Sequence, residues 1–291
     1  MSRSPFASKA TAPDHVRPGT TLMDFLVARF PKIPASVWAA RFRRALITND
    51  KGEALTAESL LLPGMAVHYF REVEDEESIP FQEQVIHEDA HLIVACKPHF
   101  LPVIPSGKFV NETLLTRLQK RFDEPDLTPI NRIDRETAGL VLFSRKKESR
   151  GLYQGLFMDR KVGKVYEALS HHRPDTPGPF DIENRLVKGD PWFRMAQEPG
   201  ESNAISRIEL VEPRGEGGLF RIVPLTGKKH QIRLHMCAIG APIANDPFYP
   251  TLQDEAPENY AAPLKLLAKE IRFTDPVTGE PRHFISPRLL D

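Results

Sequence analysis

The amino-acid sequence predicts an α+β protein, in which a mixed, largely antiparallel sheet carries packed helices and follows a small α+β domain. Three observations support this prediction. Beyond residue 80, apolar or alternating stretches outnumber helical stretches and follow one another as hairpins. The length of 291 residues suits one large domain or two smaller ones. No internal repeat is visible, so a repeat architecture has no support.

Composition is typical of a globular protein, with 41% hydrophobic and 27% charged residues. No apolar run approaches the ~20 residues that a membrane helix needs. Residues 1–19 lack the apolar core of a secretory signal. Cys96 and Cys237 lie in apolar surroundings, which indicates reduced thiols and a cytoplasmic protein.

Charge gives no overall attraction to nucleic acid, because Lys+Arg and Asp+Glu both number 39. The basic residues are nevertheless clustered, at 41–44, 145–147, 160–164 and 228–229. Such clusters can bind phosphates locally despite a neutral sum. They can equally be solvated faces of the protein, and the distribution alone leaves both interpretations open.

The first 80 residues predict a small domain and a linker. Residues 1–16 are polar and irregular, and we expect them to be disordered. Apolar spacing predicts a helix from Thr20 and a second helix over 36–45, with Ser36 as its N-cap. Two short strands, over 45–48 and 66–70, are expected next. The acidic stretch 72–80 ends in proline and is the predicted linker.

Residues 17–71 resemble the S4-type RNA-binding module, which combines two short helices with a small strand pair. Arg41 and Arg44 are expected on a basic face of the second helix. The alternative is a small α+β cap that does not contact RNA.

Residues 81–291 form the predicted main domain. Two apolar runs joined by Glu88 and Asp89 predict a hairpin, which ends at Lys97-Pro98 because proline cannot donate to a strand ladder. Residues 171–203 lack clear periodicity and are expected to be loops with short strands. The other expected elements are a helix capped by Asn111, a buried strand over 140–143, a helix over 149–159, strands over 164–169, 204–210 and 219–225, and a helix over 231–239 that ends before Gly240.

A dense cluster of charges precedes the predicted strand 140–143. Asp134 lies between Arg132 and Arg135. A nearby cation keeps a carboxylate ionised, so Asp134 would be available as a nucleophile or a base. The alternative, which spacing alone favours, is a structural ion pair.

Arg233 and Tyr166 are the candidate companions of Asp134. Arg233 lies on the first turn of a predicted helix, and arginine can hold a carboxylate through two parallel hydrogen bonds. The group from Lys228 to Arg233 could also bind phosphate. Tyr166, on a predicted strand, could stack on a flat substrate and exchange a proton, or it could be a half-buried packing residue.

Several common chemistries have no support in the sequence. His230 and His235 are five residues apart, which on a helix turns the second by ~140° past the first, so they do not share a face. No histidine and cysteine set has zinc spacing. No P-loop, dinucleotide fingerprint or Gly-x-Ser-x-Gly elbow is present, so we expect no ATP, NAD or common esterase chemistry.

Three segments together resemble the RluA-type RNA pseudouridine synthases. Asn131-Arg132-Ile133-Asp134-Arg135-Glu136-Thr137-Ala138-Gly139-Leu140 is similar to the family motif His-Arg-Leu-Asp-x-x-Thr-Ser-Gly-Leu. Thr226-Gly227-Lys228-Lys229-His230-Gln231-Ile232-Arg233-Leu234-His235 is similar to Thr-Gly-Arg-x-His-Gln-Ile-Arg-x-His, and Lys164-Val165-Tyr166-Glu167-Ala168 matches Lys-x-Tyr-x-Ala. The similarity spans residues 80–287, and its specificity lies in the order and joint presence of the motifs. Asn131, Ala138, Lys228 and Lys269 depart from the usual residues.

The resemblance implies the pseudouridine synthase fold and the isomerisation of specific uridines in structured RNA. Ribosomal RNA is the favoured target, and transfer RNA is a second candidate. Asp134 would be the nucleophile, Tyr166 would stack on the flipped uracil and transfer protons, and Arg233 would pair with Asp134. Arg132 would enter the vacated stack. Ile232, Lys228, His230 and Gln231 would complete the substrate-binding residues.

The resemblance also implies that the reaction needs no cofactor and no metal. We expect RNA as the partner, no membrane association, and a monomer. The first alternative is a catalytically silent RNA-binding protein on the same fold, against which the joint presence of Asp134, Tyr166 and Arg233 argues. The second is a glycosidase-like hydrolase that releases the base.

Overall fold

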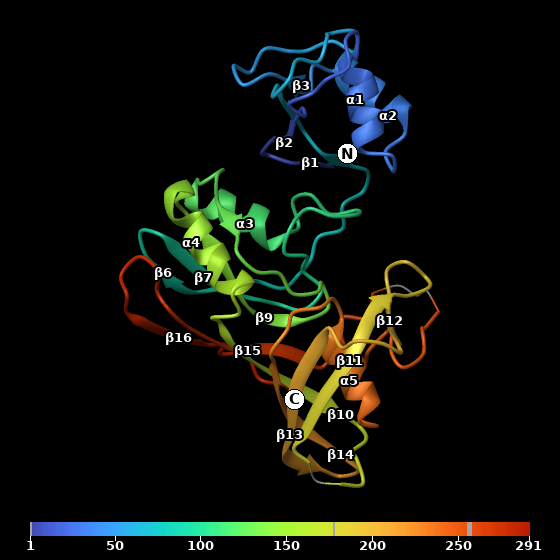
Figure 1. Ribbon diagram of the computed structural model, residues 1–291, viewed down its shortest axis with the longest axis vertical. Coiled ribbons are helices and arrows are strands. Elements are labelled where there is room, and N and C mark those ends of the chain that lie inside the picture. Colours follow the sequence, from blue (N-terminus) through green and yellow to red (C-terminus); the bar gives the residue numbers. More distant parts are fainter. Residues whose placement is uncertain (1, 177, 255–257) are drawn as a thin grey trace. The chain divides into compact units, whose positions relative to one another are not determined.

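The computed structural model describes residues 2–176, 178–254 and 258–291 (Figure 1). The chain divides into two compact units. The N-terminal unit extends to Glu77 and includes Ser106–Asn111, and the C-terminal unit comprises Ser78–Pro105 and Glu112–Asp291. No helix in the described ranges is long and apolar enough to cross a membrane.

The N-terminal unit combines two helices, α1 (Leu22–Arg29) and α2 (Ala35–Arg43), with the three-stranded antiparallel sheet β2-β4-β3. Its strands are β2 (Ser8–Thr11), β3 (Ile47–Thr48) and β4 (Ala66–Tyr69). Helix α1 begins at a capping box, in which Thr21 and Asp24 satisfy each other's backbone amides. Leu22, Leu26 and Trp38 are fully buried and form the core of the unit. The resemblance of this region to an S4-type module stays a prediction.

The N-terminal unit differs from the sequence expectations in two segments. We expected residues 1–16 to be disordered, but β2 pairs with β4 along four residues and buries Ala10; Met1 lies outside the described residues. The two-residue strand β1 (Ser2–Arg3) pairs with β5 (Glu72–Val73), so the predicted linker begins as a strand.

Helix α2 also differs from expectation. It starts after Pro34 without a side-chain cap, one residue before the predicted cap Ser36. Arg41 is buried with its guanidinium 4.7 Å from the centroid of the Trp38 ring, so it packs in the core and does not belong to an exposed basic face.

The C-terminal unit is built on an eleven-stranded sheet whose main order is β12-β11-β13-β14-β10-β15-β9-β7-β6, with β16 beside β15 and β8 beside β9. Among its described pairs, β15–β9 is parallel and the others are antiparallel. This confirms the predicted α+β fold with a mixed, largely antiparallel sheet. The strands are β6 (Gln84–Glu88), β7 (Leu92–Lys97), β8 (Thr128–Pro129), β9 (Ala138–Ser144), β10 (Gly163–Ser170), β11 (Phe180–Lys188), β12 (Met195–Glu198), β13 (Ala204–Arg214), β14 (Gly217–Pro224), β15 (Leu266–Thr274) and β16 (Pro281–Ile285).

Three helices complete the C-terminal unit: α3 (Leu114–Phe122), α4 (Lys147–Met158) and α5 (Gln231–Ala238). Helix α4 contacts β9 and buries Tyr153 in one apolar cluster with strands of that half of the sheet. Helix α5 contacts β12 and β13 and buries Met236 in a second cluster at the other half (Figure 1). These two clusters therefore lie one at each half of the sheet.

Several elements of this unit differ from the predictions, and the helices and one missed strand differ most clearly. Thr113 caps α3 in place of Asn111, because the Thr113 hydroxyl accepts the amide of Thr116. Helix α4 starts at Lys147, two residues before the expected Ser149. Helix α5 ends at Ala238, one residue early. Within 171–203, β11 is a nine-residue strand, whose alternation is interrupted by the buried polar Asn184 and by the adjacent apolar pair Leu186-Val187.

Gly139 fixes the position where β9 begins. Here β9 runs parallel to β15, with Gly139 opposite Ala268. Gly139 has φ +116°, and a Cβ at this position would lie 2.2 Å from the carbonyl oxygen of Ala268. Glycine is therefore required, and it sets the loop carrying Asp134 at the point where β9 meets β15.

Candidate active site

The loop that carries Asp134 lies between β8 and β9, and its backbone is held by the last residue of β7 and by His99, two residues further on. The ammonium of Lys97 is fully buried and donates to the carbonyl oxygen of Arg135 at 2.9 Å. His99 Nδ1 lies 2.6 Å from the carbonyl oxygen of Glu136. Burial lowers the pKa of Lys97 to about 7, against the opposing attraction of Glu136 and Asp134. The loop backbone is thus anchored at the two residues that follow Asp134.

Asn131, which departs from the family motif, has a structural partner in β9. Its Oδ1 accepts the backbone amide of Leu142 at 2.8 Å, and its Nδ2 lies 3.5 Å from the carbonyl oxygen of Leu140. The Asn131 side chain therefore takes the place of a neighbouring strand, because it pairs with backbone groups of β9 at the start of the loop that carries Asp134.

Arg233 lies at the start of α5, with its side chain only 1% exposed. Asp246 holds it through two hydrogen bonds, from Nε to Oδ2 at 2.7 Å and from Nη2 to Oδ1 at 2.5 Å. The third nitrogen, Nη1, lies 3.5 Å from Oδ2 of Asp134. Burial opposes the charge of Arg233, but the bonds to Asp246 outweigh it and raise the pKa of the guanidinium.

The site around Arg233 is walled by the segment that contains Asp246. Asp246 Oδ1 also accepts the backbone amides of Phe248 and Tyr249, at 2.8 and 3.1 Å. The Arg233 guanidinium lies 4.7 Å from the Phe248 ring centroid and 5.3 Å from that of Tyr249. The carboxylate and the two rings together fix the orientation of the guanidinium.

The Asp134 carboxylate makes only long contacts with the other described residues of the site, and 28% of its side chain is exposed. Its described partners are Arg233 Nη1 at 3.5 Å and His230 Nε2 at 3.8 Å. Burial raises the pKa of the Asp134 carboxyl above its ordinary value, against the lowering effect of Arg233. Arg233 and Asp134 lie within ion-pair distance, as predicted, but this is the longer of the two ion pairs of Arg233.

Tyr166 lies on β10 at a bulge between Val165 and Tyr166, where the register with β15 shifts. Such bulges often re-aim a side chain beside a functional site. The ring is half-buried against the apolar cluster that includes Ile222 and Ile232. Burial, together with the negative charge of Asp134, raises the pKa of the phenol.

His230 is a neutral residue of the site wall. It is buried, in the left-handed conformation with φ 54°, immediately before α5. Its Nδ1 lies 2.9 Å from the Tyr249 hydroxyl. Burial, with repulsion from Arg233 and Lys229, lowers the pKa of His230 to about 3, so the imidazole is uncharged near pH 7.

The other predicted substrate-binding residues fall into two groups. Arg132 and Lys228 are exposed. Ile232 is nearly buried in the cluster beneath Tyr166. Gln231 is buried, accepts from Thr226 Oγ1 and the Lys228 amide, and donates to Ile205 and Ser206. The Gln231 side-chain amide thus joins the turn before α5 to β13 with its hydrogen-bonding groups occupied within the protein, and its role in substrate binding stays a prediction.

Sequence reasoning missed Asp246, Phe248 and Tyr249. Asp246 follows Arg233 by thirteen residues in a segment without regular periodicity, and no spacing rule connects the two. The usable signal was local: an aspartate followed by proline and an aromatic pair, Asp246-Pro247-Phe248-Tyr249. Among the described residues, no group of three His, Cys, Asp or Glu side chains could hold a metal ion.

Comparison with known proteins assigns a family to this site. The model of the RNA pseudouridylate synthase family matches residues 91–238, a range that contains Asp134, Tyr166 and Arg233. The chain is 30% identical over 203 residues to an uncharacterised RNA pseudouridine synthase of Helicobacter pylori, covering 66% of this chain and 68% of that protein. It is 29% identical over 202 residues to the dual-specificity RNA pseudouridine synthase RluA of Vibrio parahaemolyticus, covering 66% and 78%.

Solved structures show the same fold at low sequence identity. The structure of human RNA pseudouridylate synthase domain containing 1 superposes with a TM-score of 0.59 at 20% identity, covering 71% of this chain and 84% of that one. Human RNA pseudouridylate synthase domain containing 4 gives 0.56 at 24% identity, covering 70% and 88%. With the family match spanning half of the sequence, these findings show that the chain belongs to the RluA-type family of RNA pseudouridine synthases.

Proposed function

We propose that this protein isomerises specific uridines of structured RNA to pseudouridine, with Asp134 as the nucleophile and the target base flipped out of its stack. The observation that carries the proposal is the state of the Asp134 carboxylate. It lies at the surface end of a buried ion-pair cluster, and its described contacts leave lone pairs unoccupied. A carboxylate in this state can attack a carbon atom, whereas one saturated by hydrogen bonds cannot do so without losing them.

The proposed steps balance as an isomerisation. A carboxylate oxygen of Asp134 attacks C1′ of the uridine, and the C1′–N1 bond breaks with its electron pair leaving on uracil. The base rotates in place, and C5 forms the new bond to C1′ as the carboxylate leaves. C5 then loses its proton and N1 gains one. No oxidant, reductant or second substrate is needed.

Tyr166 is proposed to stack on the flipped uracil. The pKa of its phenol is raised by burial and by Asp134, so the phenol stays protonated at neutral pH. This supports a role in donating a hydrogen bond or a proton over a role in abstracting one. Ile232, packed beside Tyr166, supports the same position from below.

Positive charge near Asp134 supports RNA as the substrate. Arg132, exposed two residues before Asp134, is proposed to fill the space that the flipped base leaves in the stack. Lys228 and Lys229 are exposed at the turn before α5 and are proposed to contact phosphates.

We also propose that the N-terminal unit is an S4-like RNA-binding module. Ribosomal RNA is the favoured target and transfer RNA the second, and the protein is proposed to work in the cytoplasm.

The substitution Asp134→Asn tests the nucleophile. Total RNA from cells that lack the protein is the substrate, and pseudouridine is measured by chromatography of the digested product. We expect product formation to fall by about 10³-fold or more, because the amide removes the attacking group but keeps its shape. RNA binding should stay within about threefold. The exposed Asp126→Asn is the matched control, with unchanged activity.

Three outcomes would contradict the proposal. Equal pseudouridine formation by the Asp134→Asn variant would remove Asp134 as the nucleophile. Release of free uracil by the native protein, without pseudouridine, would favour the hydrolase alternative. Absence of both products, with RNA binding retained, would favour the catalytically silent alternative.

A further inference from the structure

The turn between β11 and β12 carries a tryptophan that the proposed reaction does not use. Trp192 is 71% exposed, and it is the one aromatic residue among the described large apolar side chains that are mostly exposed. An indole ring offers a large apolar face and a polar N–H, and tryptophan is enriched where proteins bind other molecules, so Trp192 is a candidate contact residue.

The turn that presents Trp192 is closed by its own hydrogen bonds. The amide of Gly189 donates to the carbonyl oxygen of Arg194 at 3.1 Å, and the amide of Arg194 donates to that of Pro191 at 2.9 Å. Arg194 also lies over the Tyr249 ring, with its Cζ 4.8 Å from the centroid. The position of Trp192 is therefore set by a tied turn and not by a free loop.

The same turn is fastened to the wall of the candidate active site. Lys229 Nζ donates to the carbonyl oxygen of Phe193 at 2.6 Å. The Phe193 ring lies 5.3 Å from the Phe248 ring, which in turn lies over the Arg233 guanidinium. Trp192 is thus placed by the residues that orient Arg233, and its position relative to Asp134 is fixed through them.

The surroundings of Trp192 favour a nucleic acid as the covering molecule. Lys228 and Lys229 are exposed on the neighbouring turn, and Arg132 is exposed beside Asp134. Exposed cations together with an exposed aromatic ring suit a single strand, since cations contact phosphates while a ring stacks on a base. A base can reach the indole face only where it is not held in a duplex.

We propose that Trp192 is a second base-binding position, which stacks on an unpaired base of the RNA that flanks the target uridine. The proposal rests on the proposed function and deepens it, because it assigns a residue of this chain to the RNA that flanks the target uridine. The first position holds the uridine that reacts, and Trp192 holds a neighbour that does not react.

The substitutions Trp192→Ala and Trp192→Phe test the position by steady-state kinetics with total RNA from cells that lack the protein. We expect Trp192→Ala to raise the RNA concentration for half-maximal rate by about 10-fold, because a stacking surface is lost. The maximal rate should stay within about threefold, and Trp192→Phe should restore most of the affinity. Val211→Ala, an exposed apolar residue of β13, is the matched control and should behave as the native protein.

Tryptophan fluorescence gives a second readout that does not depend on catalysis. The chain has two tryptophans, and Trp38 is fully buried. Oligouridylate should quench the fluorescence of the native protein and of the Asp134→Asn variant, and should not quench that of Trp192→Phe. Oligouridylate paired with oligoadenylate should quench much less.

The results separate this proposal from the proposed reaction. The base-binding position would be overturned, with the reaction left standing, if Trp192→Ala had the same RNA concentration for half-maximal rate as the native protein. It would also be overturned if oligouridylate left the fluorescence of the native protein unchanged. Equal quenching by the paired RNA would also overturn it. Quenching by RNA in a protein that forms no pseudouridine would leave the base-binding position standing and overturn the reaction.

Discussion

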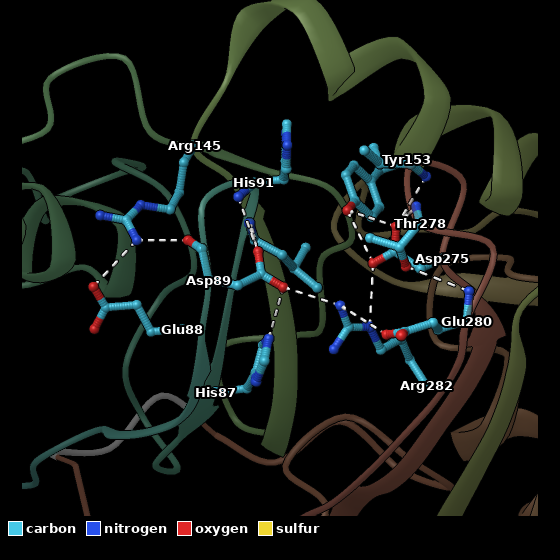
Figure 2. Close-up of polar contacts among 12 residues, drawn as sticks. His87, Glu88, Asp89, His91, Arg145, Tyr153, Asp275, Thr278, Glu280 and Arg282 are labelled. Carbon is cyan, nitrogen blue, oxygen red and sulfur yellow. Dashed lines mark hydrogen bonds and ion pairs between the residues drawn. The ribbon is translucent and has the colours of Figure 1, made fainter.

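Two clusters in the C-terminal unit place an arginine between two aspartates, and they differ in what their carboxylates can still do. In the first, Arg233 lies between Asp134 and Asp246. In the second, Arg282 lies between Asp89 and Asp275, with its Nη2 3.4 Å from Asp89 and its Nε 3.3 Å from Asp275 (Figure 2). The residue types are the same, so composition does not distinguish the two clusters.

Asp275 is saturated with hydrogen bonds. Its side chain is fully buried, and it accepts the backbone amides of Val277 and Thr278 at 2.9 and 3.2 Å. The Tyr153 hydroxyl donates to it at 3.2 Å. Figure 2 shows these groups converging on Asp275 from α4 and from the turn that joins β15 to β16. The carboxylate therefore ties a helix to a hairpin and has a structural role.

Asp89 is occupied in the same way at the turn between β6 and β7. It accepts the amides of His91 and Leu92, both at 2.9 Å, and lies 2.9 Å from His87 Nε2. Burial alone would raise the pKa of Asp89, but these hydrogen bonds outweigh burial and lower it. The pKa of Asp134 shifts in the opposite direction, because its carboxylate has no comparable set of donors among the described residues.

The contrast shows which arginine–aspartate pairs are candidates for chemistry. A carboxylate whose oxygens are filled by backbone amides stabilises the fold. A partly buried carboxylate that keeps unoccupied lone pairs is destabilised in its charged form and is available to react, as at Asp134. The deciding property is the hydrogen-bond occupancy of the carboxylate, which only the folded chain reveals.

The largest expected effect comes from Asp275→Asn, which breaks the second cluster. We expect the free energy of unfolding to fall by about 3 kcal/mol, because Arg282 and two turn amides lose a charged acceptor. Urea denaturation measures this loss. Pseudouridine formation per folded molecule should be unchanged at a temperature where the variant is folded.

The reverse pattern is expected for Asp134→Asn. The pKa of Asp134 is raised in the folded protein. The free energy of unfolding therefore falls as pH rises from the ordinary pKa of the carboxyl to its raised pKa, because the unfolded chain ionises first. The neutral variant should be at least as stable as the native protein at pH 7. A large loss of stability in Asp134→Asn, or of activity in folded Asp275→Asn, would erase the distinction between the clusters.

The next effect is expected from Asp246→Asn, which tests whether Asp246 is a positioning residue for Arg233. The amide cannot accept both guanidinium bonds, so Arg233 is freed to move toward Asp134. We expect the maximal rate to fall by about 10²-fold, the cost of misplacing a catalytic contact. The acid limb of the pH–rate profile should move to lower pH, because the uncompensated charge of Arg233 then lowers the pKa of Asp134.

The pH shift distinguishes positioning from simple structural support. A fall in rate that is equal at every pH would make Asp246 a structural residue only. Asp254→Asn, an exposed carboxylate later in the same segment, is the matched control and should leave both the rate and the pH profile unchanged.

Much of the fold was predictable because its strands are apolar runs bounded by turn residues. The strand over 140–143 and the hairpin over 85–97 were found in this way. Helix starts were less predictable, because several polar residues compete for each cap and tertiary contacts decide between them. Thr113 caps α3, while the Asn111 amide binds Glu76 within the N-terminal unit. Arg41 was predicted on an exposed face, because helical spacing does not reveal that its guanidinium packs on the Trp38 ring.

The candidate site was predictable only where motifs carry it. Resemblance identified Asp134, Tyr166 and Arg233 together, but the strongest partner of Arg233 comes from a segment that no motif reaches. Gln231 was expected to face the substrate, yet all of its hydrogen bonds lie within the protein. His230 is uncharged near pH 7 because burial lowers its pKa, and residue spacing in the sequence does not predict that burial.

The smallest effect is expected from Asn131→Ala, at the position that departs from the family motif. The variant leaves the backbone amide of Leu142 without its acceptor inside a buried strand. We expect a loss of about 1 kcal/mol in the free energy of unfolding. Hydrogen exchange at the Leu142 amide should accelerate, whereas Asp126→Ala on the neighbouring exposed loop should alter neither quantity.

The Asn131→Ala variant also distinguishes two roles of Asn131, support of β9 and contact with the RNA. If Asn131 serves β9 alone, the affinity for RNA should be unchanged in Asn131→Ala, and the rate should change only as far as the Asp134 loop loosens. A large rise in the RNA concentration for half-maximal rate, with Leu142 still protected, would instead place Asn131 at the substrate. The hydrogen bond to Leu142 favours the first result, because the Oδ1 that would face a ligand is already occupied by the strand that positions Asp134.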